Sequence, residues 1–165
     1  MYPLKQPSTF EEFIDNSYYY RGKLIDEFCH IEMELERYLV RYFLHTKPER
    51  RELKNLILDR MTFESKRTAF KAMLDKKAVE NGFVKTKTNS YLHNNLINEI
   101  RLLNDQRNYF AHYYLAIPLN VTEYVIMLAE YRDSVKVHKY TFEKYNTIIE
   151  RIKAVVKEIE ILRGE

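Results

Sequence analysis

The chain has no tryptophan, one cysteine, three glycines and four prolines among its 165 residues. The single Cys29 excludes an internal disulfide, and no Cys/His cluster has the spacing of zinc ligands. Scarce glycine and proline in a sequence that is 45% hydrophobic favour long regular elements over disorder. No apolar run approaches membrane-spanning length, and Met1–Lys5 lacks a signal peptide's apolar core. We therefore expect one soluble, cytoplasmic domain over residues 1–165, without a metal ion or cofactor.

The formal net charge of +3 permits an anionic partner such as RNA without requiring one. Cations are dense between Lys47 and Lys77, with few acids among them. This distribution fits either a track for a nucleic-acid backbone, with Lys66 and Arg67 as RNA contacts, or a solvated helix face, which is the commoner case. The cations in question are Arg50, Arg51, Lys54, Arg60, Lys66, Arg67, Lys71 and Lys76.

The triplet Thr-Phe-Glu occurs three times, beginning at Thr9, Thr62 and Thr141. Each copy supplies an N-cap hydroxyl and an acid in the first helical turn, where the helix dipole favours negative charge. The sequences that follow the triplets do not match, so the repeat reflects capping and not internal duplication. Apolar periodicity predicts a short helix at Leu53–Leu58, after a break at Lys47–Arg51, and longer helices over Ser8–His45, Thr62–Asn81, Asn89–Tyr113 and Thr141–Leu162.

The segment between the last two predicted helices differs in composition, because it is rich in β-branched and aromatic residues. Residues Val135–Tyr140 alternate with period two after a turn at Arg132-Asp133, which predicts a β-hairpin within about 114–140. The fold class is therefore mainly α. We expect an up-and-down bundle of four to five helices with one β-hairpin before the last helix.

The hexapeptide Arg107-Asn108-Tyr109-Phe110-Ala111-His112 lies near the end of the fourth predicted helix. At about 100° per residue, Arg107 falls in the apolar sector of that helix. Burying a guanidinium alone is costly, so a carboxylate, a phosphate or a subunit boundary is expected beside it. The other members of the sector are Leu92, Leu96, Ile100, Leu103 and Phe110.

Glu32 is the best candidate for the partner of Arg107, because it falls on the apolar face of the first helix, whereas Glu34 points away from that face. The alternative is that Glu32 lies at the edge of the apolar stripe and reaches solvent. His112 follows Arg107 by five residues, so it points about 140° away and lies roughly 7.5 Å further along a regular helix. A joint site would need a distorted helix end or a second copy across a two-fold axis, and the spacing therefore predicts a homodimer.

The hexapeptide consists of an arginine, a polar residue, three further residues and a histidine, late in a predicted helix. This pattern resembles the signature of HEPN (higher eukaryotes and prokaryotes nucleotide-binding) domains. The order of the predicted elements extends this resemblance over nearly the whole chain, although only the hexapeptide is specific. The resemblance implies a metal-independent endoribonuclease with a composite site in a homodimer. In that role Arg107 would stabilise phosphate charge, His112 would transfer a proton, Asn108 would hold the phosphate or orient His112, and Tyr109 and Tyr113 would contact RNA bases.

A second possibility remains open, namely a non-catalytic HEPN-type module for dimerisation or for binding RNA or nucleotides. Arg107 would then be structural, and His112 would be an ordinary histidine at a helix C-terminus. The remaining histidines, His30, His45, His93 and His138, form no second constellation in the sequence. If the protein is an active ribonuclease, analogy with the family implies a toxin or defence effector that requires a neutralising antitoxin protein.

Overall fold

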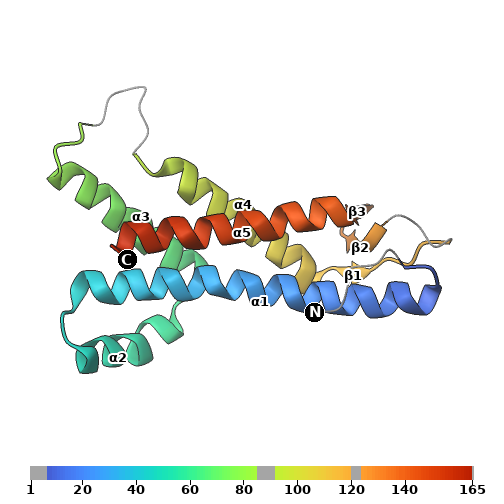
Figure 1. The fold of residues 1–165 in the computed structure, drawn as a ribbon, viewed down its shortest axis with the longest axis horizontal. Coiled ribbons are helices and arrows are strands. Elements are labelled where there is room, and N and C mark those ends of the chain that lie inside the picture. The colour runs from blue at the N-terminus through green and yellow to red at the C-terminus, as the bar shows by residue number, and fades with distance from the viewer. Residues whose placement is uncertain (1–6, 85–91, 120–123, 165) are drawn as a thin grey trace. The chain divides into compact units, whose positions relative to one another are not determined.

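The computed structural model describes residues 7–84, 92–119 and 124–164 of the chain (Figure 1). Within these residues the fold is mainly α, with five α-helices and a small antiparallel sheet, which confirms the predicted class and the hairpin before the last helix. The elements in chain order are α1 Phe10–Phe43, α2 Lys47–Leu56, the 3-10 helix η1 Leu58–Arg60, α3 Phe63–Glu80, α4 Asn94–His112, β1 Tyr114–Leu115, β2 Tyr124–Tyr131, β3 Val135–Thr141 and α5 Phe142–Arg163.

The chain divides into two compact units. The first, which we call the hairpin unit, contains the residues up to Phe28 together with Leu103–Lys153. The second, which we call the helical unit, contains Cys29–Leu102 and the residues from Ala154 onward. Helices α1, α4 and α5 each contribute residues to both units. The single domain that the sequence suggests stays a prediction.

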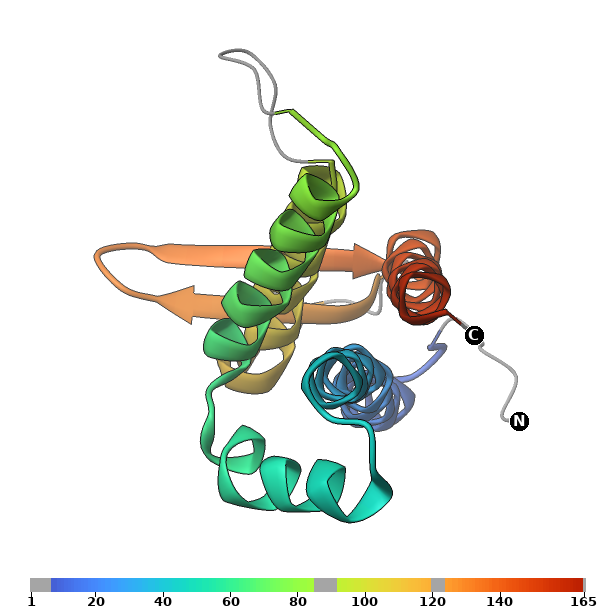
Figure 2. The ribbon, with the colours of Figure 1, turned by 90° about the vertical axis from the view of Figure 1, so that its left-hand side faces the viewer.

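The hairpin unit combines the small sheet with an aromatic core. Strand β2 pairs antiparallel with both β1 and β3, and Figure 2 shows the long strands β2 and β3 side by side. Their turn follows Tyr131, at the predicted position. Since aromatic side chains bury large areas, the core of this unit gains much of its hydrophobic stabilisation from five rings that are at most 1% exposed: Phe13, Tyr20, Phe110, Tyr140 and Tyr145.

The helical unit contains the second part of α1, all of α2, η1 and α3, the start of α4 and the end of α5. The predicted break between the first helix and a second, shorter one is present, but it does not lie at Lys47–Arg51, because α1 ends at Phe43 and these residues form the start of α2. The carboxylate of Glu49 accepts hydrogen bonds from the backbone N–H of Thr46 at 3.4 Å and from its hydroxyl at 2.6 Å. Pro48 lies in the first turn, where a missing N–H costs nothing. The proline therefore begins a helix at this position.

The three Thr-Phe-Glu triplets cap helices as predicted. In each case the threonine hydroxyl accepts a hydrogen bond from the backbone N–H three residues later. The pairs are Thr9 with Glu12, Thr62 with Ser65 and Thr141 with Lys144, all at 3.2 Å. Because such a bond satisfies one of the free N–H groups of the first turn, a short local pattern is sufficient to fix each helix start.

Two expectations for apolar and acidic positions are wrong. Leu92 is 62% exposed and precedes α4, which begins at Asn94; the predicted start at residues 89–91 lies outside the described residues. Glu34 does not point to solvent, because it is 2% exposed and forms an ion pair with Arg163 at 2.7 Å. An opposite charge from α5 makes this burial possible, and the periodicity of α1 alone does not reveal that charge.

Candidate functional site at the end of helix α4

The last turns of α4 are anchored to the core of the hairpin unit. Phe110 is fully buried, with its ring edge-on to Tyr140 at a centroid distance of 4.7 Å. The Tyr140 hydroxyl donates a hydrogen bond to the side-chain oxygen of Gln106 at 3.0 Å. Residues before and after Arg107 are therefore fixed against β3, which sets the direction in which the motif side chains leave the helix.

Arg21 of α1 caps the same helix end. Its Nε donates to the carbonyl of Phe110 at 2.8 Å, and a terminal nitrogen donates to the carbonyl of Ala111 at 3.4 Å. The last carbonyls of a helix lack intrahelical partners and carry partial negative charge, so a guanidinium is well suited to this position. The role of Arg21 is not recognisable from the sequence, because Arg21 lies 89 residues before Phe110 and no spacing rule joins them.

Arg107, Asn108 and His112 form a polar strip along this anchored helix end. A guanidinium nitrogen of Arg107 donates to the side-chain oxygen of Asn108 at 3.1 Å. Asn108 and His112 are four residues apart and therefore share a helix face, with Cβ atoms roughly 5–6 Å apart. Arg107 and Asn108 are partly exposed, and His112 is exposed. Asn108 thus binds Arg107 and lies on the same helix face as His112.

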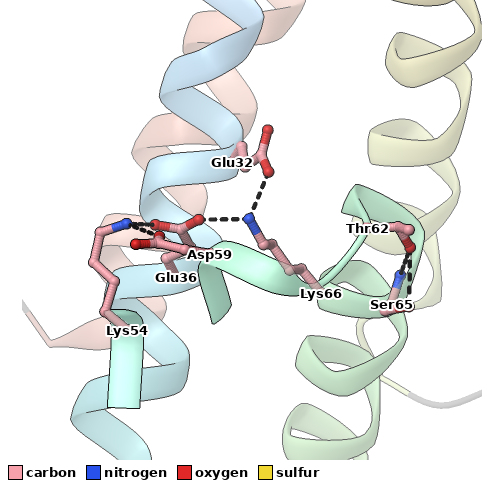
Figure 3. A network of polar contacts seen from close by, with 7 residues as sticks. All are labelled: Glu32, Glu36, Lys54, Asp59, Thr62, Ser65 and Lys66. Atoms are coloured by element: carbon pink, nitrogen blue, oxygen red, sulfur yellow. Dashed lines mark hydrogen bonds and ion pairs between the residues drawn. The ribbon is translucent and has the colours of Figure 1, made fainter. Parts of the chain in front are cut away.

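No carboxylate in the described parts of the chain forms an ion pair with Arg107. The predicted partner, Glu32, belongs to the helical unit and binds Lys66 instead, at 2.6 Å. Lys66 also binds Glu36 at 2.6 Å, so it lies between the two acids, as Figure 3 shows. The expected pairing of Glu32 with Arg107 is therefore replaced by a local ion pair between α1 and α3.

The expectation of RNA contacts by Lys66 and Arg67 also has to be corrected. Lys66 is only 4% exposed and is held by its two acids, so it is closed to a nucleic acid. Burial alone would lower its pKa, but hydrogen bonds to Glu32 and Glu36 outweigh burial and raise the pKa of Lys66. The Arg67 side chain is 14% exposed and pairs with Glu64 in the same helix. Both cations serve the helical unit itself.

An aromatic cluster adjoins the polar strip. Tyr109 and Tyr113 stack with a centroid distance of 4.9 Å and an angle of 16° between their rings. His138 of β3 contacts both rings, at 4.7 Å from Tyr109 and 5.4 Å from Tyr113. Its Nε2 is buried without a hydrogen-bond partner among the described residues, and the nearest acid oxygen, on Glu130, is 3.9 Å away.

Burial, followed by the positive charge of Lys136, lowers the pKa of His138, so its ring is neutral at neutral pH. Burial and a hydrogen bond with Glu130 raise the pKa of Tyr113, which therefore keeps its phenolic proton. His138 belongs to no motif in the sequence. One signal was present, because period-two alternation places His138 on the same face of β3 as the fully buried Tyr140.

Across residues 7–84, 92–119 and 124–164, no group of three or more His, Cys, Asp and Glu side chains is placed to hold a metal ion. None of the helices in that part of the chain is both long and apolar enough to cross a membrane. No family model matches the chain, and neither the curated proteins nor the solved structures include a match.

Proposed function

We propose that this chain is a metal-independent endoribonuclease of the HEPN type, with Arg107 and His112 as catalytic residues. The observation that carries the proposal is the state of Arg107. It is partly exposed on an anchored helix end and has no carboxylate partner in the described chain, whereas Lys66 and Arg67 of the helical unit pair with acids. Its guanidinium is therefore available to a phosphate or to a second copy of the chain.

The reaction that fits these side chains is attack of a ribose 2′-oxygen on the adjacent phosphorus. A new bond forms between O2′ and phosphorus, the bond from phosphorus to O5′ breaks, and the products carry a 2′,3′-cyclic phosphate and a 5′-hydroxyl. The 2′-OH loses a proton and the leaving 5′-oxygen gains one, and histidine is the residue type suited to such transfers near neutral pH. His112 is exposed and can reach an incoming substrate.

Arg107 would stabilise the negative charge that builds up on the phosphate oxygens, because a guanidinium offers two parallel N–H groups to an anion. Asn108 supports this role, since it accepts one N–H of Arg107 and leaves the other nitrogens available. The Tyr109–Tyr113 pair adjoins the strip and offers an RNA base a ring on which to stack.

A second copy of the chain would complete the site by bringing another polar strip to the same phosphate. Apolar exposure next to the motif supports this part of the proposal. Tyr114, directly after α4, is 68% exposed and packs edge-on against Tyr131, which is 62% exposed. Such a pair is a suitable element of an interface, because tyrosine combines a large apolar ring with a polar group.

The deciding experiment compares wild type, Arg107→Ala, His112→Ala and the matched control His30→Ala on cellular RNA in EDTA. His30 is an exposed histidine on α1, outside the motif, so its loss controls for the substitution and for contaminating nucleases. We expect cleavage with 2′,3′-cyclic phosphate ends by wild type and His30→Ala, and a loss of about 10²-fold or more in both motif variants. Mass in solution should correspond to a dimer for all four proteins.

Intact RNA with all four folded proteins would contradict the proposal and favour a non-catalytic HEPN-type module for dimerisation or RNA binding. A monomeric wild type that cleaves RNA would keep the chemistry and exclude the composite site. Because an unregulated ribonuclease harms its own cell, we further propose a toxin or defence role with a neutralising protein partner. Expression of wild type should then arrest growth, whereas equal expression of His112→Ala should not.

A further inference from the structure

Four arginines of the helical unit line one pocket. Arg37 and Arg41 come from the end of α1, Arg50 from the start of α2 and Arg163 from the end of α5, and Val40 completes the lining. The pocket volume is about 320 Å³, near the lower end of the range of ligand sites. Like charges repel, so a convergence of four guanidinium groups favours the binding of an anion.

A buried ion pair forms the fixed part of this pocket. The carboxylate of Glu34 pairs with Arg163 at 2.7 Å, and the two side chains are 3% and 6% exposed. Glu34 also pairs with Arg37 through its other oxygen. One carboxylate thus serves two arginines, and Arg163 is held in a defined position on the pocket wall.

The rim is more accessible. The Arg37 side chain is 54% exposed, and Arg41 is exposed as well. Arg50 is oriented by its Nε, which donates to the carbonyl of Leu44 at 2.8 Å, and its two terminal nitrogens extend beyond this bond. The residues that line the pocket include no acid. The site therefore combines a buried wall with more exposed cationic side chains at its rim.

The cation-rich stretch between Lys47 and Lys77 is a weaker candidate than this pocket for binding an anion. Most of its cations have local carboxylate partners, so that stretch offers little free positive charge to a nucleic acid. The ion pairs are Lys54 with Glu36 and Asp59, Lys66 with Glu32 and Glu36, Arg67 with Glu64, Lys71 with Asp75 and Lys76 with Glu80.

We propose that the pocket of Arg37, Arg41, Arg50 and Arg163 binds a phosphate group. Guanidinium groups bind phosphate through paired N–H bonds, and several of them can surround its oxygens from different sides. The phosphate can belong to a free polyphosphate ligand or to a nucleic-acid backbone. This inference does not rest on the proposed ribonuclease, because it concerns other residues and needs no cleavage.

Isothermal titration calorimetry with pyrophosphate, ATP and a single-stranded deoxyoligonucleotide tests the site, since none of these probes contains a ribose phosphodiester that the proposed chemistry could cleave. The test variant is Arg37→Gln/Arg41→Gln. The matched control is Arg51→Gln/Arg60→Gln, which removes the same charge from exposed positions outside the pocket. Arg37→Gln alone provides a milder variant, and circular dichroism checks that each protein is folded.

We expect the test variant to weaken binding about tenfold or more, which corresponds to the loss of two charge-assisted contacts, and the control to stay within about twofold. Loss of pyrophosphate and ATP binding would identify a polyphosphate ligand. Loss confined to the oligonucleotide would identify a backbone phosphate. Absence of binding by wild type to all three probes, or equal weakening in the test and control variants, would overturn the proposal.

Discussion

Lys66 of the helical unit and Arg107 of the hairpin unit are two cations with opposite surroundings. Lys66 is 4% exposed and lies between the carboxylates of Glu32 and Glu36, in a network that continues through Lys54 to Asp59 (Figure 3). Arg107 is partly exposed and donates to Asn108, with no carboxylate partner among the described residues. Lys66 therefore finds its partners within the fold, whereas Arg107 has N–H groups that remain available to an external anion.

This difference separates a structural charge from a candidate functional one. A buried lysine with two acids contributes to a defined packing of α3 on α1, because removing it would leave carboxylates without compensation. A partly exposed arginine with unused N–H groups contributes little to folding and can bind an external anion. Mutations in the two places should therefore affect different measurements.

The largest effect is expected from Arg107→Ala on RNA cleavage, a decrease of about 10²–10³-fold through loss of charge stabilisation at the phosphate. The free energy of unfolding should change by no more than about 0.5–1 kcal/mol, because no buried acid is stranded. Single-turnover cleavage and urea unfolding give the two values. Arg107→Lys should recover little cleavage, since it restores the charge without the paired N–H groups. A large decrease in the free energy of unfolding of Arg107→Ala would show that Arg107, like Lys66, has a structural role.

Lys66→Met should lower the free energy of unfolding by about 3–5 kcal/mol, because it leaves Glu32 and Glu36 close together without their shared cation. Lys76→Met is the matched control on the same helix, since Lys76 is 65% exposed and 3.8 Å from Glu80, and its loss should cost no more than about 0.5–1 kcal/mol. Denaturant unfolding of both variants provides the comparison. Equal effects would show that burial of the ion pair is unimportant.

Arg21→Ala should have a smaller effect on stability, a loss of about 1.5–3 kcal/mol, because two carbonyls at the end of α4 lose a charged donor. Cleavage should fall as well, since the same bonds position the turn that carries His112. Lys23→Ala, two residues further along α1, provides the control and should change neither measurement. An Arg21→Ala protein with unchanged stability and full cleavage would show that Arg21 does not contribute to the site.

The smallest effect concerns pH. The pKa of His138 is lowered in the fold from 6.5, so the unfolded chain binds the proton more readily. The stabilisation from neutral His138 is complete above about pH 6.5 and is lost as the pH falls through its lower folded pKa. His138→Phe keeps a ring beside Tyr109 and Tyr113 but cannot be protonated. Urea unfolding at several pH values should show a weaker acid destabilisation in this variant, and an unchanged pH dependence would contradict the prediction.

Much of the fold was predictable from the sequence, because its determinants are local. The threonine caps at Thr9, Thr62 and Thr141 act over three residues, and the turn after Tyr131 follows from the strand pattern around it. One boundary is wrong. The break predicted at Lys47–Arg51 lies before these residues, because Thr46 and Glu49 cap a helix that begins at Lys47. The capping pair is visible in the sequence, and Pro48 is compatible with the first turn of this helix.

The candidate site was predictable in part. The motif residues lie at the end of α4 as expected, since helical periodicity and the hexapeptide place them there. The partner of Glu32 was not predictable, because a carboxylate on an apolar face indicates only that some cation is near. Arg21 and His138 were missed for a related reason, since each reaches the motif from an element distant in the sequence.

The sequence by itself determined the helices, their caps, the hairpin and the position of the Arg107–His112 motif, because these follow from interactions over a few residues. Only the tertiary structure decided which charges are compensated. Lys66 and Glu34 have partners of opposite charge within the fold, whereas Arg107 has no acid among the described residues. The physical reason is that a charged side chain on an apolar helix face indicates only that a partner is expected. Which partner it has depends on the distant segments that pack beside it, or on a ligand where no segment provides one.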